Sequence, residues 1–161
     1  MPIASSPASF SVYDLGSSWE NQHGGAQGLA SLAGRPVVIA MVYTHCGTTC
    51  PLIIETMKRL EAKSHNVSLV LLSLDPDVDD ARALARYARE KALSGRWTLL
   101  RGSEGATREL AAVLDVRYRR ASAAELDHSN TITILDSAGR IVSQQPSWDG
   151  DAALAALSSL R

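Results

Sequence analysis

Two long apolar runs, at residues 37–42 and 67–74, constrain the fold of this 161-residue chain more than any other feature. They read VVIAMV and VSLVLLSL, and the first lacks the apolar–polar alternation of a half-exposed strand. Strands of this composition are buried on both faces, as in parallel sheets that carry helices on each side. The sequence therefore predicts an α/β fold with these two strands inside the sheet.

The remaining segments complete the α/β pattern. Helices are predicted over residues 52–62, 79–93, 105–114 and 150–160, and further strands over residues 10–15, 97–101, 131–135 and 140–143. Helical crossovers predict parallel pairing in the first half, and the turn DSAG predicts a C-terminal antiparallel hairpin. The expected architecture is a three-layer fold, with a mixed central sheet flanked by helices. Loops are predicted at 16–28, anchored by Trp19, and at 115–130.

Length and composition limit the possible classes of protein. The chain is long enough for one domain with its own core, which we assign to residues 10–161; residues 1–9 are expected to be disordered. A net charge of −1 offers no basic face for nucleic acid. The longest apolar run is far below the ~20 residues that cross a bilayer, and residues 1–10 do not read as a signal peptide.

Both cysteines of the chain, Cys46 and Cys50, lie in VYTHCGTTCPL, directly after the first buried strand. Ligands of open α/β sheets gather beyond the carboxyl ends of strands, and paired cysteines there are a thioredoxin-like arrangement. Spacing alone leaves a redox dithiol, a metal site and two buried core thiols open. A position in the first helical turn should lower the pKa of the Cys50 thiol, which serves redox chemistry and metal binding alike.

A histidine before the last hairpin favours a metal. Asp127-His128-Ser129 stands where a thioredoxin-like redox protein usually carries a cis-proline, close to the start of the first helix. His128 can therefore complete a Cys, Cys, His site. Two thiolates and one imidazole suit copper, Cu(I) especially, and also zinc. Three protein ligands leave the site open, as a carrier that releases its ion requires.

Three segments, YTHCGTTCP, SLDPDVDD and LDHSNTITILDSAG, resemble the Sco (SenC) family in their order and spacing. Members of that family are thioredoxin-like proteins that bind copper and help to build the binuclear copper A centre of cytochrome c oxidase. The resemblance runs from about residue 10 to the end of the chain. It implies one copper ion per chain, as Cu(I) or Cu(II), held by Cys46, Cys50 and His128. The chain departs from the family at residues 47–49, where Pro-Asp is frequent.

The resemblance implies a metallochaperone rather than an enzyme. Its expected partner is cytochrome c oxidase subunit II, whose copper A site it would load, with another copper chaperone or a thiol reductase as further partners. The expected location is the periplasm, with a membrane anchor that this chain lacks. Two alternatives stay open: a thiol–disulfide oxidoreductase that uses Cys46 and Cys50 as its redox pair, and a copper or redox sensor.

Other polar residues receive simpler interpretations. Strand alternation turns His45 away from Cys46, so we expect it to support the site rather than to bind metal. His23 and His65 are expected at the surface, and Asp75 is expected to end a strand and cap a turn. Three arginines are expected to be solvated in a loop or to dock an acidic partner surface: Arg117, Arg119 and Arg120.

Overall fold

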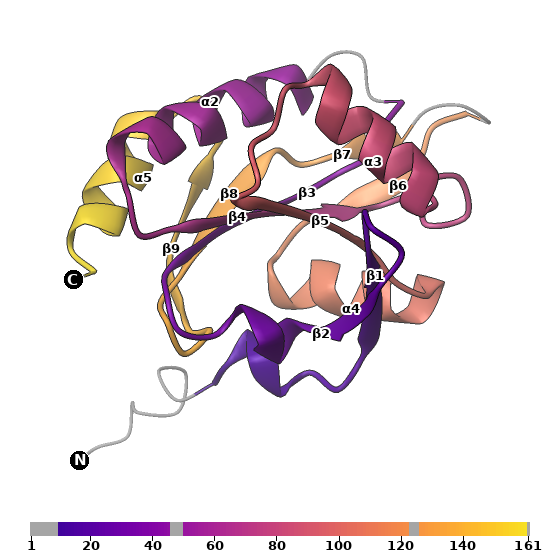
Figure 1. Ribbon diagram of the computed structural model, residues 1–161, viewed down its shortest axis with the longest axis horizontal. Helices are drawn as coiled ribbons and strands as arrows, with labels where there is room; N and C mark the ends of the chain where they lie inside the picture. Colours follow the sequence, from indigo (N-terminus) through magenta and orange to yellow (C-terminus); the bar gives the residue numbers. More distant parts are fainter. Residues whose placement is uncertain (1–9, 46–49, 123–125, 161) are drawn as a thin grey trace.

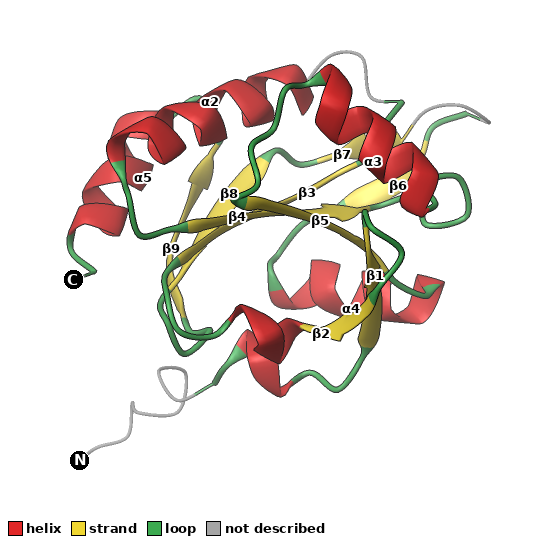
Figure 2. Cartoon of the chain, in the orientation of Figure 1, coloured by secondary structure: helices red, strands yellow, loops and turns green. Residues whose placement is uncertain are grey.

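The computed structural model describes residues 10–45, 50–122 and 126–160. It has the expected three layers, with one large mixed sheet between two helical layers (Figure 1, Figure 2). The expectation of disorder for residues 1–9 lies outside the described residues. No helix of the described residues has the length and apolar character needed to span a membrane.

The large sheet has seven strands in the order β2-β1-β5-β4-β3-β8-β9. Its centre is parallel and consists of β3 (Val37–Val42), β4 (Ser68–Ser73) and β5 (Trp97–Arg101). Every residue of β3 is buried, which confirms the prediction from its continuous apolar run. Parallel pairing puts the carboxyl ends of β3 and β4 side by side at one edge of the sheet.

Antiparallel hairpins flank this centre. One is formed by β8 (Thr131–Leu135) and β9 (Ile141–Pro146), and β8 pairs with β3. The other is formed by β1 (Ser18–Asn21) and β2 (Ala26–Gly28), and β1 pairs with β5. The C-terminal hairpin is therefore confirmed, and the mixed sheet arises because parallel and antiparallel pairs share β3 and β5.

Alternate side chains of the central strands build two separate cores. Val38, Ala40 and Val42 belong to the core under one helical layer. Ile39 and Met41 belong to the core on the other face. The first layer consists of α2 (Cys50–Lys63), α3 (Ala81–Glu90) and α5 (Gly150–Ser158). The second consists of α4 (Glu104–Val113) and two 3-10 turns, η1 (Val12–Asp14) and η2 (Leu29–Leu32).

The strand predicted over residues 10–15 is wrong, because this segment forms η1. The Ser11 hydroxyl accepts a hydrogen bond from the Tyr13 backbone and caps the turn. The Val12 side chain is fully buried, so the turn satisfies the apolar pattern that suggested a strand.

Both predicted loops contain strands. Residues 16–28 form the β1–β2 hairpin, although Trp19 is the buried anchor that was expected, with 2% of its surface exposed. Residues 115–130 contain a second, two-stranded sheet of β6 (Tyr118–Arg120) and β7 (Leu126–His128). His128 therefore lies at the end of a paired strand rather than on a long irregular loop.

Candidate metal centre

The two predicted halves of the site meet at the edge of the sheet where β3 ends. Helix α2 begins at Cys50, so this cysteine lies in the first helical turn, as predicted. The β6–β7 hairpin brings His128 to the same place, although 78 positions separate the two residues in the sequence. Cys46 lies outside the described residues.

The Cys50 side chain and the His128 ring are in direct contact. The Cys50 sulfur lies 3.5 Å from Nε2 of His128. Cys50 is fully buried, and its sulfur sits among core residues of the α2 layer. His128 is partly exposed, so the pair can be reached from solvent on the imidazole side.

A hydrogen bond orients the imidazole for this contact. Nδ1 of His128 lies 3.0 Å from the backbone carbonyl oxygen of Ser129. A carbonyl oxygen can only accept, so Nδ1 carries the proton and donates it. In the neutral ring the Nε2 lone pair then points toward the Cys50 sulfur. Histidine ligands in metalloproteins are commonly oriented in this way, with one nitrogen donating and the other binding the ion.

The separation of sulfur and nitrogen suits a bridging metal ion. Metal–sulfur and metal–nitrogen bonds of about 2.3 and 2.0 Å, at tetrahedral or trigonal angles, hold the two atoms about 3.5–3.8 Å apart. The observed sulfur–nitrogen distance of 3.5 Å lies at the lower end of that range. No group of three or more potential ligands occurs within the described residues, so Cys50 and His128 form a pair to which Cys46 is the candidate third ligand.

Tyr43, the residue that follows β3, holds the histidine hairpin against the sheet. Its hydroxyl accepts a hydrogen bond from the Leu126 backbone at 3.2 Å. Its ring meets the His128 ring edge-on, with centroids 5.7 Å apart. The side chain is buried, with 5% of its surface exposed. Tyr43 therefore fixes both the backbone of β7 and the plane of the imidazole.

An ion pair ties the other strand of the hairpin to the sheet edge. Arg120, in β6, contacts the Asp75 carboxylate at 2.9 Å, and the Asp75 side chain is only 10% exposed. Asp75 thus does more than end a strand. Arg119 makes a longer contact of 3.6 Å with Asp127 on the paired strand, and both side chains remain largely exposed. Arg120 is half exposed, as a solvated residue should be, but it lies in a strand rather than in a loop and pairs with Asp75.

A pocket of about 310 Å³ opens beside the imidazole, lined by residues of the hairpin including Arg117, Tyr118 and His128. Tyr118 is the cross-strand partner of His128. Burial raises the pKa of the Tyr118 phenol, and the nearby Arg108 charge partly opposes this effect. Tyr118 is therefore a neutral neighbour of the imidazole at physiological pH.

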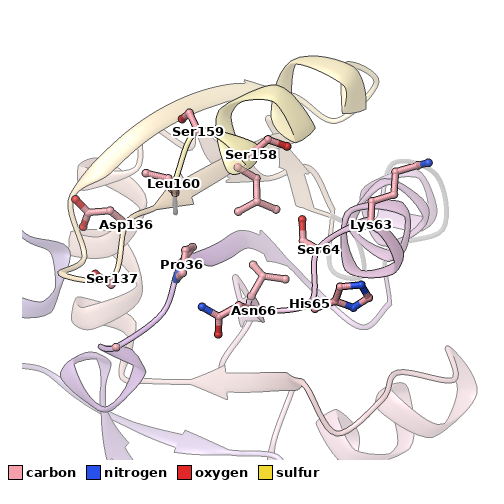
Figure 3. A pocket seen from close by; sticks show the side chains of 13 residues that line it. Pro36, Lys63, Ser64, His65, Asn66, Asp136, Ser137, Ser158, Ser159 and Leu160 are labelled. Carbon is pink, nitrogen blue, oxygen red and sulfur yellow. The ribbon is translucent and has the colours of Figure 1, made fainter.

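A larger pocket of about 810 Å³ lies away from the two candidate ligands (Figure 3). Pro36 and Val67 line it, and these residues precede β3 and β4, so it sits at the opposite edge of the sheet from Cys50. Figure 3 shows Asp136 and His65 on opposite sides of this hollow. By volume alone this pocket would be the candidate functional site, but Cys50 and His128 lie at the opposite edge of the sheet.

Tyr43→Phe tests whether the hairpin depends on the tyrosine hydroxyl. We expect it to lower the free energy of unfolding by about 1 kcal/mol, because the buried Leu126 amide loses its acceptor. Chemical denaturation would measure the change. The matched control is Tyr118→Phe, whose hydroxyl makes no hydrogen bond among the described residues, and equal losses in the two variants would contradict the assignment.

Sequence reasoning placed Cys50 and His128 at the site but overlooked Tyr43 and Arg120. An aromatic residue between a buried strand and the cysteine motif was the one available signal for Tyr43. Arg120 pairs with a residue 45 positions away, and nothing in a single sequence marks such a contact. His45, the histidine of the cysteine motif itself, is exposed.

Comparison with known proteins gives a consistent assignment. The family model described as SCO1/SenC matches residues 13–159, most of the chain. A curated relative, the "SCO1 protein homolog" of Bacillus subtilis (strain 168), is 32% identical over 89 residues. That match covers 52% of this chain and 46% of the relative, so it spans about half the length of each protein.

Solved structures share the fold at low sequence identity. The structure of Bradyrhizobium japonicum ScoI with copper bound has a TM-score of 0.73 and 23% identity, and the match covers 90% of this chain and 97% of that one. BsSco, described as a Sco family cytochrome c oxidase assembly protein with a disulfide switch, has a TM-score of 0.76 and 21% identity. That match covers 89% of this chain and 90% of BsSco, and the thioredoxin-like Sco fold is thereby established for this chain.

Proposed function

The chain belongs to the SCO1/SenC family, and we propose on this basis that it binds one copper ion and delivers it to the copper A site of cytochrome c oxidase subunit II. The proposed ligands are the thiolates of Cys46 and Cys50 and the imidazole of His128. The observation that carries the proposal is the 3.5 Å approach of the Cys50 sulfur to Nε2 of His128. Support also comes from related proteins, one with copper bound and one described as an oxidase assembly protein.

The chemistry of the donor atoms favours copper as cargo. Soft thiolates with one imidazole bind Cu(I) well, and two thiolates compete for copper only when both have lost their protons. Cys50 lies at the start of α2, where the positive end of the helix dipole stabilises a thiolate. A bound cation and the helix dipole would therefore both favour the thiolate form of Cys50.

The open coordination of the proposed site suits transfer. Three protein ligands leave room for a thiolate or imidazole of an acceptor to approach the ion before a donor ligand leaves. Cys50 is buried and His128 is partly exposed, so an acceptor would enter from the histidine side. The pocket beside His128 lies on this route. In this proposal the acceptor is subunit II, and the protein works on the periplasmic side of a membrane.

The second candidate is a thiol–disulfide oxidoreductase that keeps the cysteines of the acceptor reduced. The position of Cys50 at a helix N-terminus favours this function as much as it favours metal binding. The two candidates differ in their need for His128. Copper delivery requires its Nε2 atom, whereas dithiol exchange requires only the two cysteines.

A copper titration of the reduced chain tests the proposal. We expect one copper ion per chain to survive desalting, with thiolate-to-copper absorption bands, and no retained copper in the Cys50→Ala variant. Metal analysis and visible absorption measure these quantities. A wild-type chain that retains no copper and yet reduces disulfide substrates would overturn delivery and favour the oxidoreductase.

A further inference from the structure

Asp79 is a buried acidic residue to which the proposed copper binding assigns no role. It lies in the connection between β4 and α3, at the edge of the sheet that carries the candidate metal centre. Its solvent exposure is 0%. The sequence pattern suggested a place in the first turn of the next helix, but Asp80 takes the capping position there. Asp79 instead points into the protein.

Three donors from the ends of two strands converge on the Asp79 carboxylate. Oδ1 accepts a hydrogen bond of 2.5 Å from the Thr44 hydroxyl. Oδ2 accepts from the Thr44 backbone at 3.1 Å and from the Ser73 hydroxyl at 2.8 Å. Asp79 forms no ion pair among the described residues, so these neutral donors replace the water that the carboxylate loses on burial.

Thr44 is the residue through which Asp79 can act on the site. It follows Tyr43 directly and stands two positions before Cys46. Asp79 binds both its backbone and its side chain, which leaves this residue little freedom to turn or shift. The chain therefore leaves β3 and enters the cysteine motif from a fixed point. A hydrophobic residue at position 79 would fill the space but would bind neither donor of Thr44.

The same connection between β4 and α3 also contacts the hairpin that carries His128. The Ser73 hydroxyl accepts a hydrogen bond from the Asp75 backbone and donates to Asp79. The Asp75 carboxylate in turn pairs with Arg120 of the hairpin that carries His128. Residues 73–79 therefore link the start of the cysteine motif to the histidine hairpin by an unbroken series of polar contacts.

We propose that Asp79 is a positioning residue for copper binding, which fixes Thr44 between Tyr43, whose ring contacts His128, and the start of the cysteine motif. This inference rests on the proposed copper-binding function. Asp79 touches neither candidate ligand in the described structure, so its effect is exerted through Thr44. Residues that orient metal ligands typically contribute 10–100-fold to metal affinity, which sets the scale of the expected effect.

Copper affinity of three variants of the full chain would test the role. Thr44→Val removes one donor and keeps the backbone contact, so we expect affinity to fall about tenfold. Asp79→Ala removes every contact and should cost more. Asp79→Asn should recover most of the loss, because its amide oxygen can accept from the Thr44 backbone and Ser73 while its NH₂ group faces the Thr44 hydroxyl.

Thr107→Val is the matched control for Thr44→Val. Thr107 is buried whereas Thr44 is partly exposed; the Thr107 hydroxyl donates to the Ser103 carbonyl at 2.8 Å, but this residue lies in α4 on the far face of the sheet. This variant should lose comparable stability with unchanged copper affinity. Equal effects of the two threonine variants on affinity would overturn the positioning role. If Asp79→Ala does not fold, Thr44→Val and Asp79→Asn still test the positioning role of Asp79.

Two measurements on the metal-free chain separate this inference from the proposed function. The Thr44 amide should be protected from hydrogen exchange in the wild type and should lose that protection in Asp79→Ala. Alkylation rates of the cysteines should change in Thr44→Val and stay constant in Thr107→Val. A wild type that retains no copper but shows these changes would overturn the proposed function and leave the role of Asp79 standing. Unchanged exchange and alkylation rates would overturn the role of Asp79.

Discussion

Replacing His128 with alanine is expected to lower the affinity of the reduced protein for copper by more than about a hundredfold, because loss of a ligand should exceed the loss from residues that only orient ligands. The imidazole is held in place before any ion arrives. Nδ1 donates to the Ser129 carbonyl, and Nε2 faces the Cys50 sulfur at 3.5 Å. Removing the ring therefore removes a donor atom that is already oriented. Competition with a Cu(I) chelator of known affinity would measure the change.

His45→Ala is the control for His128→Ala. His45 precedes Cys46 in the sequence, so it is nearer to the cysteine motif than His128 is along the chain. Its side chain is exposed, and among the described residues no hydrogen bond or ion pair joins it to Cys50 or to the hairpin. We expect unchanged copper affinity and unchanged absorption bands. Equal losses in the two variants would contradict the proposed ligand set, and full copper retention in His128→Ala would remove His128 from it.

Burial on both faces explains which parts of the fold could be predicted. The strand at Val37–Val42 matches its predicted bounds, because its residue types fit only one environment. The hairpin of Tyr118–Arg120 and Leu126–His128 was missed, since most of its residues face solvent and carry no apolar pattern. Strand pairing there comes from backbone contacts and from links to the sheet edge, which leave no periodic signal.

In the candidate site, too, some residues could be predicted from the sequence and others could not. Cys50 and His128 could be recognised as candidates because thiols and imidazoles bind metals. The family resemblance then implied that they hold the same copper ion. The residues that hold them could not be recognised, because Tyr43 and Asp79 act through contacts with distant or backbone atoms. An aspartate before a helix normally indicates a cap. Only the folded chain shows that Asp79 turns inward to Thr44 while its neighbour Asp80 caps the helix.

Oxidation of the metal-free chain is expected to abolish copper retention, and reduction should restore it. Oxidised glutathione would accept two electrons and two protons from Cys46 and Cys50, which would join their sulfurs in a disulfide while two glutathione thiols form. Disulfide sulfurs carry no thiolate charge, so only one of the three proposed donors, Nε2 of His128, would remain. Affinity should therefore fall by more than it does in His128→Ala, where both thiolates persist.

Mass spectrometry and metal analysis of the same samples would test this expectation. The oxidised chain should lose two hydrogen atoms, carry no glutathione and retain no copper after desalting, and treatment with a phosphine reductant should recover one copper per chain. The Cys46→Ala variant is the control for the mass measurement, because it cannot form the internal disulfide. An oxidised wild-type chain that keeps its copper would show that the ion is held outside the two thiolates. Copper retention that follows the thiol state would instead mean that the redox condition of the compartment decides when the protein can carry its cargo.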